Sequence, residues 1–245
     1  MSDGLPVVRA LWAAPAGVHA LTTTRDGGVS RGPYMSLNLG DHVGDDPEVV
    51  QRNRARACTA LGLPGPPRWL NQVHGTSVAT GDLPSQTADA SITHRRGDVL
   101  AILTADCLPV ALSAVDTVAL GLAHAGWRSL LGGVLENTVR AMQVDGAIVA
   151  WLGPAIGPDA FEVGDDVRSA FVRYDRASST AFRPGRGDRW WCDLYALAKL
   201  RLASVGVTCV HGGGRCTFGE PRTFFSHRRG APCGRQATFV WRDVQ

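Results

Sequence analysis

Two apolar segments of strand length, separated by only three residues, constrain the fold of this chain more than any other feature. Residues 108–114 and 118–123 are almost entirely apolar, and Val115-Asp116-Thr117 connects them. Two such segments joined by a short connection are typical of a β-hairpin, in which neighbouring strands run antiparallel. The sequence therefore predicts a hairpin over residues 108–123.

The open end of this hairpin carries two chemically reactive side chains. Cys107 comes immediately before the first segment, and His124 comes immediately after the second. Folding the hairpin about Asp116 brings Cys107 opposite His124 to within about one residue. A thiol and an imidazole at neighbouring strand ends belong either to a metal site or to a nucleophile–base pair.

A third residue of this kind is His74, in the segment Asn71-Gln72-Val73-His74-Gly75 after an expected strand over 68–70. One Cys and two His form a tetrahedral zinc site with one open position, the pattern of catalytic zinc. A free Cys and two hydrogen-bonded His in the core fit the spacing equally well, because such residues on apolar strands are commonly buried. Spacing by itself leaves both interpretations open.

The remaining secondary structure follows from capping residues and apolar patterns. Asp46 as N-cap and Pro47 in the first turn begin a helix that Gly62 ends. The expected helices cover residues 46–61, about 129–143, 165–174 and 193–205. Further strands are expected near residues 18–24, 98–103, 147–152, 207–210 and 237–241. Because a hairpin interrupts the alternation of helices and strands, the pattern predicts a mixed sheet with helices outside it.

Composition excludes several classes of protein. A net charge of +3 is too small to indicate a nucleic-acid-binding surface, and no run of about 18 apolar residues could span a membrane. Residues 1–6 lack the charged and apolar regions of a signal peptide, so we expect a cytoplasmic protein with reduced cysteines. No pair of cysteines has the CxxC spacing of a zinc ribbon or a thioredoxin motif.

Three segments that contain the candidate site closely resemble the laccase-domain family, also called the multicopper polyphenol oxidase or purine nucleoside phosphorylase family. They are residues 71–75, 104–109 and 123–128. Further similar segments are residues 36–40, 42–47, 153–158, 161–164 and 224–229. The resemblance implies an α+β fold, an α/β/β/α sandwich with mixed β-sheets, as a single domain over residues 1–245.

The resemblance also implies a function. The positions that match His74, Cys107 and His124 would hold zinc and form the catalytic centre. The implied activity is phosphorolysis of adenosine, inosine and methylthioadenosine, together with deamination of adenosine. The expected ligands are therefore a nucleoside and phosphate, with neither nucleic acid nor a membrane as partner. Bacterial relatives also include a peptidoglycan-editing factor that removes misincorporated serine from a cell-wall precursor, which is an alternative function.

The older oxidase name of the family can be tested by counting histidines. A four-copper centre binds its metals largely through His-x-His pairs, whereas this chain has seven His and no such pair. A single site of two His and one Cys could still hold copper, although Met1, Met35 and Met142 do not have the spacing of a blue-copper axial ligand. Zinc is therefore the expected metal, and copper could displace it in vitro. Copper-dependent phenol oxidation remains an alternative.

Candidate substrate-binding residues are basic, because phosphate needs positive charge. Arg54 lies on the first expected helix, and Arg228 with Arg229 follows Phe224-Phe225-Ser226. The usual family residue before this arginine pair is Tyr, whereas this chain has His227, which could change substrate preference or approach the metal. Asp106 is a candidate proton shuttle, although a role in turning the backbone or orienting a ligand His is the stronger interpretation.

Two mechanisms of other classes remain open. Cys107 as nucleophile and His124 as base would make a cysteine hydrolase without a metal, which leaves His74 unexplained. A non-enzymatic accessory protein with a structural metal is the third possibility, and the open fourth ligand position argues against it. The sequence contains no indication of oligomeric state.

Overall fold

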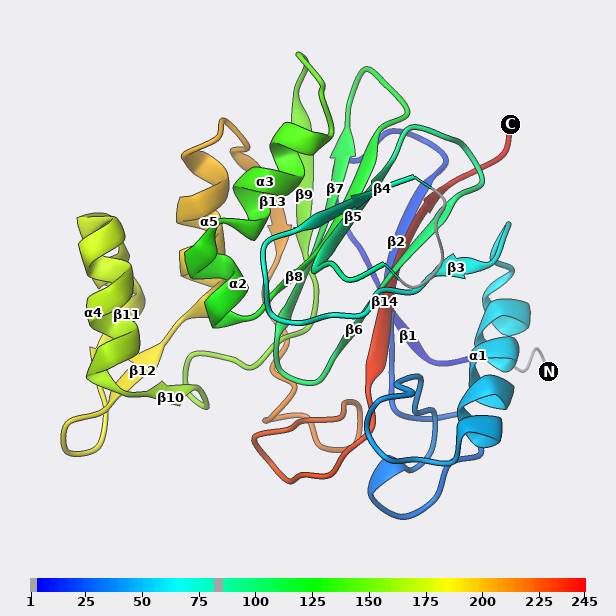
Figure 1. Ribbon diagram of the computed structural model, residues 1–245, viewed down its shortest axis with the longest axis horizontal. Helices are drawn as coiled ribbons and strands as arrows, with labels where there is room; N and C mark the ends of the chain where they lie inside the picture. Colours follow the sequence, from blue (N-terminus) through cyan, green and yellow to red (C-terminus); the bar gives the residue numbers. More distant parts are fainter. Residues whose placement is uncertain (1–3, 82–85) are drawn as a thin grey trace.

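Two mixed β-sheets packed face to face form the centre of the protein (Figure 1). We describe it from a computed structural model over residues 4–81 and 86–245. The first sheet has the order β1-β2-β14-β6-β3. Its strands are β1 (Val7–Arg9), β2 (Val18–Thr23), β14 (Gln236–Arg242), β6 (Val99–Thr104) and β3 (Pro67–Arg68). In this sheet only β3 is parallel to its neighbour. The pairing of β2 with β14 brings an N-terminal and a C-terminal strand together in the same sheet.

The second sheet contains the predicted hairpin and has the order β13-β9-β7-β8-β5-β4. Its strands are β13 (Cys209–Gly212), β9 (Ile148–Leu152), β7 (Leu108–Ala114), β8 (Leu120–Ala125), β5 (Ala90–Thr93) and β4 (Val78–Thr80). The outer pairs β13–β9 and β4–β5 are parallel, whereas the inner strands are antiparallel. The hairpin prediction is confirmed by the pairing of β7 with β8.

Successive side chains of a strand point to opposite faces of its sheet, and they contribute to three hydrophobic layers. Leu100 and Ile102 of β6 meet Leu122 of β8 between the sheets. The opposite face of the first sheet packs against α1 (Pro47–Leu61), and that of the second packs against α2 (Trp127–Gly132), α3 (Val134–Ala141) and α5 (Leu194–Ala203). Helices therefore cover both outer faces (Figure 1). The expected α/β/β/α sandwich with mixed sheets is confirmed.

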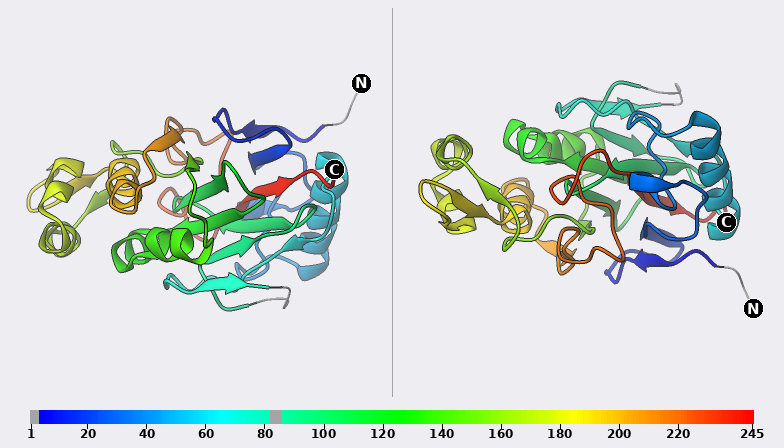
Figure 2. Two further views of the ribbon diagram at one scale, coloured as in Figure 1. Left: turned by 90° about the horizontal axis from the view of Figure 1, so that it is seen from above. Right: turned by 90° about the horizontal axis from the view of Figure 1, so that it is seen from below.

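A smaller lobe extends from one end of the sandwich (Figure 2). It holds the three-stranded sheet of β10 (Glu162–Val163), β12 (Trp190–Cys192) and β11 (Phe182–Pro184). Helix α4 (Asp165–Tyr174) and the 3-10 helix η2 (Arg176–Ala181) accompany this sheet, whereas the short η1 (Gly32–Tyr34) lies in the loop after β2. Phe171 and Phe182 are buried in the same core as α5, which attaches the lobe to the second sheet.

Helix α1 forms as predicted, because its ends are determined locally. The Asp46 carboxylate accepts a hydrogen bond from the Glu48 amide, Pro47 occupies the first turn, and Gly62 ends the helix with a left-handed φ of 61°. The single helix expected over 129–143 is wrong. Two helices occupy this region, since Gly133 has a φ of 99° and interrupts the helical hydrogen bonds between α2 and α3.

The expected strand over 68–70 is also too long, since β3 ends at Arg68. Asn71 instead forms an isolated bridge with Thr87, so the chain leaves the first sheet before it reaches His74. Among the described residues, no helix has both the length and the apolar character that crossing a bilayer would require. The sequence-based expectation about a signal peptide concerns residues 1–6, of which 1–3 lie outside the described part.

Candidate metal centre and its pocket

The open end of the β7–β8 hairpin provides two of the three candidate ligands. The register pairs Pro109 with His124 and Leu108 with Ala125. Cys107 is thus two residues from the position opposite His124, rather than about one, because the hairpin is centred beyond Asp116. Alternate residues of a strand share a face, so Cys107 and His124 still lie on the same side of the sheet.

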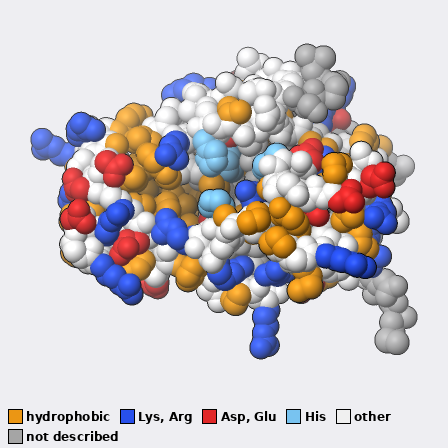
Figure 3. All heavy atoms as spheres, turned by 60° about the horizontal axis from the view of Figure 1, so that its bottom comes forward, with side chains coloured by type: hydrophobic (Ala, Val, Ile, Leu, Met, Phe, Trp, Pro, Cys, Tyr) orange, Lys and Arg blue, Asp and Glu red, His pale blue; other side chains and the backbone are white. Residues whose placement is uncertain are grey.

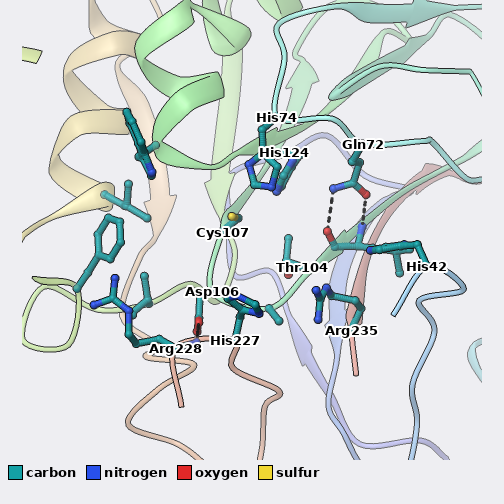
Figure 4. Close-up of a pocket in the computed structure, with 16 residues that line it drawn as sticks. His42, Gln72, His74, Thr104, Asp106, Cys107, His124, His227, Arg228 and Arg235 are labelled. Carbon is teal, nitrogen blue, oxygen red and sulfur yellow. Dashed lines mark hydrogen bonds between the residues drawn. The ribbon is translucent and has the colours of Figure 1, made fainter. Parts of the chain in front are cut away.

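The third candidate, His74, reaches the hairpin in a loop that the Gln72 side chain holds in place. The Gln72 amide donates to the Leu103 carbonyl at 2.8 Å, and the Leu103 amide donates to the Gln72 side-chain oxygen at 2.9 Å (Figure 4). The Gln72 side chain thereby makes the pair of hydrogen bonds with the β6 backbone that a neighbouring strand would otherwise make. His74 itself has a left-handed φ of 58°, which turns the chain across the end of the second sheet.

These three side chains form a compact cluster. One potential ligand atom from each of His74, Cys107 and His124 lies within 4.8 Å of the other two. The two imidazole rings meet edge to face with centroids 4.7 Å apart. Gly126 backs the cluster, since a Cβ there would lie 2.9 Å from His74 Nδ1 and 3.0 Å from Cys107 Sγ. A side chain at this position would displace His74 and Cys107, so the observed arrangement requires glycine.

Asp89, which the sequence reasoning missed, positions two of the three residues. Its buried carboxylate accepts from His124 Nδ1 at 2.8 Å. It also accepts from the backbone amides of His74 at 2.9 Å, Gly75 at 2.6 Å and Val73 at 3.2 Å. One carboxylate thus fixes both the orientation of His124 and the loop that carries His74.

The electrostatics follow from these contacts. Burial by itself would raise the pKa of Asp89, but the hydrogen bonds from His124 and Gly75 lower that pKa below its usual value. Burial opposes protonation of His124, whereas Cys107 and Asp89 raise the pKa of His124 to about 9. Burial and the neighbouring His124 lower the pKa of His74. Because ionised Asp89 can only accept, His124 Nδ1 donates to it and Nε2 is left for the Cys107 side.

The donor set and its geometry suit a zinc ion. Two imidazole nitrogens and a thiolate are common zinc ligands, and a tetrahedral site holds them about 3.3–3.6 Å apart. The candidate ligand atoms lie within 4.8 Å of one another, so a bound zinc ion would draw them closer together. A carboxylate that accepts from the far nitrogen of a ligand His is the usual support for such a site. Ligation by His74, Cys107 and His124 itself stays a prediction.

The cluster lies in the wall of an open cavity of about 370 Å³. In Figure 3 histidine side chains surround a hollow beside a hydrophobic surface. The lining residues are His42, Gln72, His74, Leu103, Thr104, Ala105, Asp106, Cys107, His124, Trp127, Ile156, Phe161, Leu194, His227, Arg228 and Arg235. Arg228 lies at one side of Cys107, and Arg235 with His42 lies at the other (Figure 4). Among the described residues of the lining, the charged side chains are Arg228, Arg235 and Asp106. Two guanidinium groups thus outnumber one carboxylate, so the cavity favours an anion.

Asp106 contacts the cavity, but its carboxylate is already engaged. It accepts from Thr217 Oγ1 at 2.6 Å, Ser226 Oγ at 3.0 Å and the Arg228 amide at 2.7 Å. Asp106 also has a φ of 93°, so it turns the chain immediately before Cys107. These contacts support the structural interpretation of Asp106, because they attach the segment with His227 and Arg228 to the turn that precedes Cys107.

The predicted substrate-binding arginines separate into two groups. Arg228 lines the cavity, where it donates to the Glu162 carbonyl at 3.1 Å and lies 5.3 Å from the Phe161 ring centroid. His227 lines it too, at the mouth.

Arg54 and Arg229 do not line the cavity. Arg54 donates to the Leu39 carbonyl at 2.9 Å, pairs with Asp41 at 3.2 Å and stacks on Trp69. Arg229 is bound to the Thr217 and Phe224 carbonyls. A phosphate-binding role for Arg54 stays a prediction.

Three residues of the site were not predicted from the sequence, and they differ in the strength of their local sequence signal. Asp89 stands between Ala88 and Ala90 in a short stretch without other charges, and a carboxylate in such a setting signals a buried, bonded group. Gln72 is adjacent to the recognised His74 motif. Arg235 gave no local signal, because a basic residue near a chain end is commonly solvated.

Comparison with known proteins places the chain in a family. The sequence profile described as multi-copper polyphenol oxidoreductase laccase matches residues 19–243. A purine nucleoside phosphorylase of Xylella fastidiosa is 50% identical over 96% of both chains. The Escherichia coli (strain K12) protein named purine nucleoside phosphorylase YfiH is 51% identical over 94% of this chain and 96% of its own.

Solved structures agree with this assignment. Protein NMB0706 of Neisseria meningitidis is 47% identical and superposes with a TM-score of 0.91 over 97% of this chain and 99% of its own. YlmD of Geobacillus stearothermophilus is 32% identical, with a TM-score of 0.87 over 97% of this chain and all of its own. The chain therefore belongs to the multi-copper polyphenol oxidoreductase laccase family.

Proposed function

We propose that this protein is a zinc-dependent purine nucleoside phosphorylase that also deaminates adenosine and cleaves methylthioadenosine. The observation that carries the proposal is the His74–Cys107–His124 cluster in the wall of an anion-favouring cavity. The names of relatives about 50% identical to this chain point to the same reaction class.

The cavity is suited to a nucleoside because its two sides differ in character. Trp127, Ile156, Phe161 and Leu194 line the cavity and pack in one hydrophobic cluster, in which Phe161 lies beside Arg228. A purine base would pack against this surface, since flat aromatic ligands gain from stacking and from loss of apolar area to water. Its ribose would then lie near the metal-site cluster. The apolar side would also accept the methylthio group of methylthioadenosine.

His74, Cys107 and His124 would hold the zinc, with Asp89 orienting His124. When bound, zinc would supply Lewis-acid polarisation of an oxygen atom near the ribose. Asp106 would keep His227 and Arg228 at the cavity mouth through its bonds to Ser226 and the Arg228 amide. His227 is exposed at this mouth, where it would contact the substrate directly.

One observation favours a second candidate, a metal-free cysteine hydrolase. Asp89, His124 and Cys107 stand in the order orienting acid, base and nucleophile. In that reading His74 would have no chemical role. An editing hydrolase that acts on a cell-wall precursor could use either arrangement, and phenol oxidation would need copper at the same cluster.

The test uses purified protein with its metal content measured. Adenosine or inosine with phosphate should yield free base and ribose 1-phosphate, and omission of phosphate should stop base release while adenosine deamination continues. Chelation should abolish both reactions, and zinc should restore them. His74→Ala separates the candidates, since a zinc enzyme loses activity and a metal-free hydrolase keeps it. Activity confined to a muramyl peptide would reject the nucleoside assignment.

A further inference from the structure

Arg235 is a rigidly held arginine at the side of the cavity opposite Arg228 (Figure 4). Its backbone is bound on both sides, because its amide donates to Asn38 Oδ1 at 2.9 Å and its carbonyl accepts from the Leu39 amide at 3.0 Å. One guanidinium nitrogen donates to the carbonyls of Cys233 at 2.9 Å and Gly234 at 3.1 Å. The side chain is therefore positioned before any ligand arrives.

Gly40 contributes to this positioning by its lack of a side chain. A Cβ at Gly40 would lie only 2.7 Å from Cγ of Arg235. The segment with Asn38 and Gly40 thus fits closely around the aliphatic part of Arg235. Because the Arg235 side chain is already fixed, it loses little conformational entropy when an anionic ligand binds.

The rest of the Arg235 guanidinium has no protein partner in the part of the chain that the structure describes. All of its side-chain hydrogen bonds use a single nitrogen, NH1, and no described carboxylate lies within ion-pair distance. Arg54, by contrast, is neutralised by Asp41. A half-buried cation without a counter-charge has an electrostatic cost that an anionic ligand would remove.

The neighbours of Arg235 extend this site. Thr104 is buried and lines the same side of the cavity, and its hydroxyl has no hydrogen-bond partner among the described residues. The pKa of His42 is lowered, mainly by burial and next by the charge of Arg235. Among the lining residues that the structure describes, Asp106 is the only one with a carboxylate, and it already accepts three hydrogen bonds. An unsatisfied hydroxyl and an unpaired guanidinium on one wall suit a tetrahedral oxyanion.

We propose that Arg235 and Thr104 form a phosphate-binding subsite, beside the metal cluster and opposite the apolar side that would hold the base. This inference rests on the proposed function, and it assigns the phosphate to Arg235 rather than to Arg54. Phosphate could arrive as the free ion or as a phosphoryl group of a larger substrate. Both share the dianionic chemistry that a guanidinium recognises.

The experiment measures binding rather than turnover. Isothermal titration of zinc-loaded protein with inorganic phosphate should show binding that Arg235→Ala weakens about ten- to hundredfold, because a charge-assisted contact is lost. Arg52→Ala on the exposed face of α1 removes the same charge outside the cavity and should leave affinity unchanged. Thr104→Val should weaken binding less than Arg235→Ala does.

Two further variants keep the test decisive if Arg235→Ala unfolds. Gly40→Ala retains the charge but displaces the Arg235 stem, so it should also weaken phosphate binding. Arg235→Lys should bind with intermediate affinity, since it keeps the charge but loses the forked donors. Thermal unfolding and zinc content identify the variants that remain folded and loaded.

The outcomes separate this inference from the proposed function. Phosphate binding that depends on Arg235, without any phosphorolysis, would reject the function and keep the subsite. A parallel titration with a nucleoside diphosphate tests the other source of phosphate, and loss of affinity only for that ligand would assign the subsite to a larger substrate. Unchanged affinity for both ligands in folded Arg235 variants, or a larger loss in Arg54→Ala, would overturn the proposal.

Discussion

At the scale of single residues, Asp89 determines how the candidate ligands are presented. Its carboxylate binds the ring of His124 and three consecutive backbone amides, including that of His74. The three reactive side chains come from separate segments, and this one buried acceptor joins two of them. Gly126 completes the arrangement by leaving room for His74 and Cys107.

The ligand assignment predicts the zinc content of three variants. Purified protein should contain about one zinc per chain, and Cys107→Ala, His74→Ala and His124→Ala should each lose most of it, because a three-residue site cannot spare a ligand. Elemental analysis after gel filtration measures this. Cys209→Ala is the matched control, since this exposed thiol lies outside the cluster. Full zinc in folded Cys107→Ala would show that the metal binds elsewhere.

Asp89 gives a second prediction. Asp89→Asn keeps the shape but removes the charge that orients His124, so zinc affinity should fall about ten- to hundredfold. Competition with a chromogenic chelator measures the affinity. Asp98→Asn removes a carboxylate that does not line the cavity and should leave zinc affinity unchanged. Equal affinities in the two variants would assign Asp89 a purely structural role.

At the scale of secondary structure elements, helix ends fixed by a capping residue were predicted correctly, whereas the break within residues 129–143 was not. Helix α1 and the start of α5 follow from Asp46 and Asp193, whose carboxylates accept from backbone amides two and three residues later. The helix expected over 129–143 has no Pro and continues an apolar pattern, yet it breaks at Gly133. The break falls at the glycine pair Gly132-Gly133, a local helix-ending signal that the apolar pattern outweighed in the prediction. The two shorter helices both pack in the hydrophobic core that also contains α5.

The break at Gly133 predicts a stability effect. Gly133→Ala places a side chain at a φ of 99°, which should lower the free energy of unfolding by about 1–2 kcal/mol. Urea denaturation measures the change. Gly214→Ala is the control, because its Cβ would meet nothing within 4 Å and its φ is not left-handed. If Gly133→Ala is as stable as this control, the break is not under conformational constraint.

At the scale of the whole molecule, polar contacts of Asp98 join the two sheets in addition to the core between them. Asp98 accepts from Thr93 of β5 in the second sheet at 2.5 Å. It also pairs with Arg68 of β3 in the first sheet and with Arg95. Although burial opposes ionisation, the hydrogen bonds from Thr93 and Arg95 and the charge of Arg68 lower the pKa of Asp98 below its ordinary 3.8.

This junction predicts a dependence of stability on acid. A carboxyl whose pKa is lower in the folded state stabilises the fold above its unfolded pKa, and that stability is lost as pH falls through the folded value. The free energy of unfolding should therefore decline below about pH 4, and less steeply in Asp98→Asn. Urea denaturation from pH 6 to pH 3 tests this, with the exposed Asp188→Asn as control. Identical slopes in Asp98→Asn and the natural protein would contradict it.

The sequence by itself determined the hairpin and the capped helices, and it identified His74, Cys107 and His124 as candidate ligands that the structure brings together. Each of these predictions depends on short-range periodicity, capping or a local motif. The tertiary structure decided the rest. It paired β2 with β14 in the first sheet. It brought the Asp89 carboxylate into hydrogen-bonding contact with His74 and His124, and it placed Arg235 rather than Arg54 in the cavity wall. These contacts join residues far apart in the chain, so their partners are chosen by packing of the two sheets and not by any pattern within one segment.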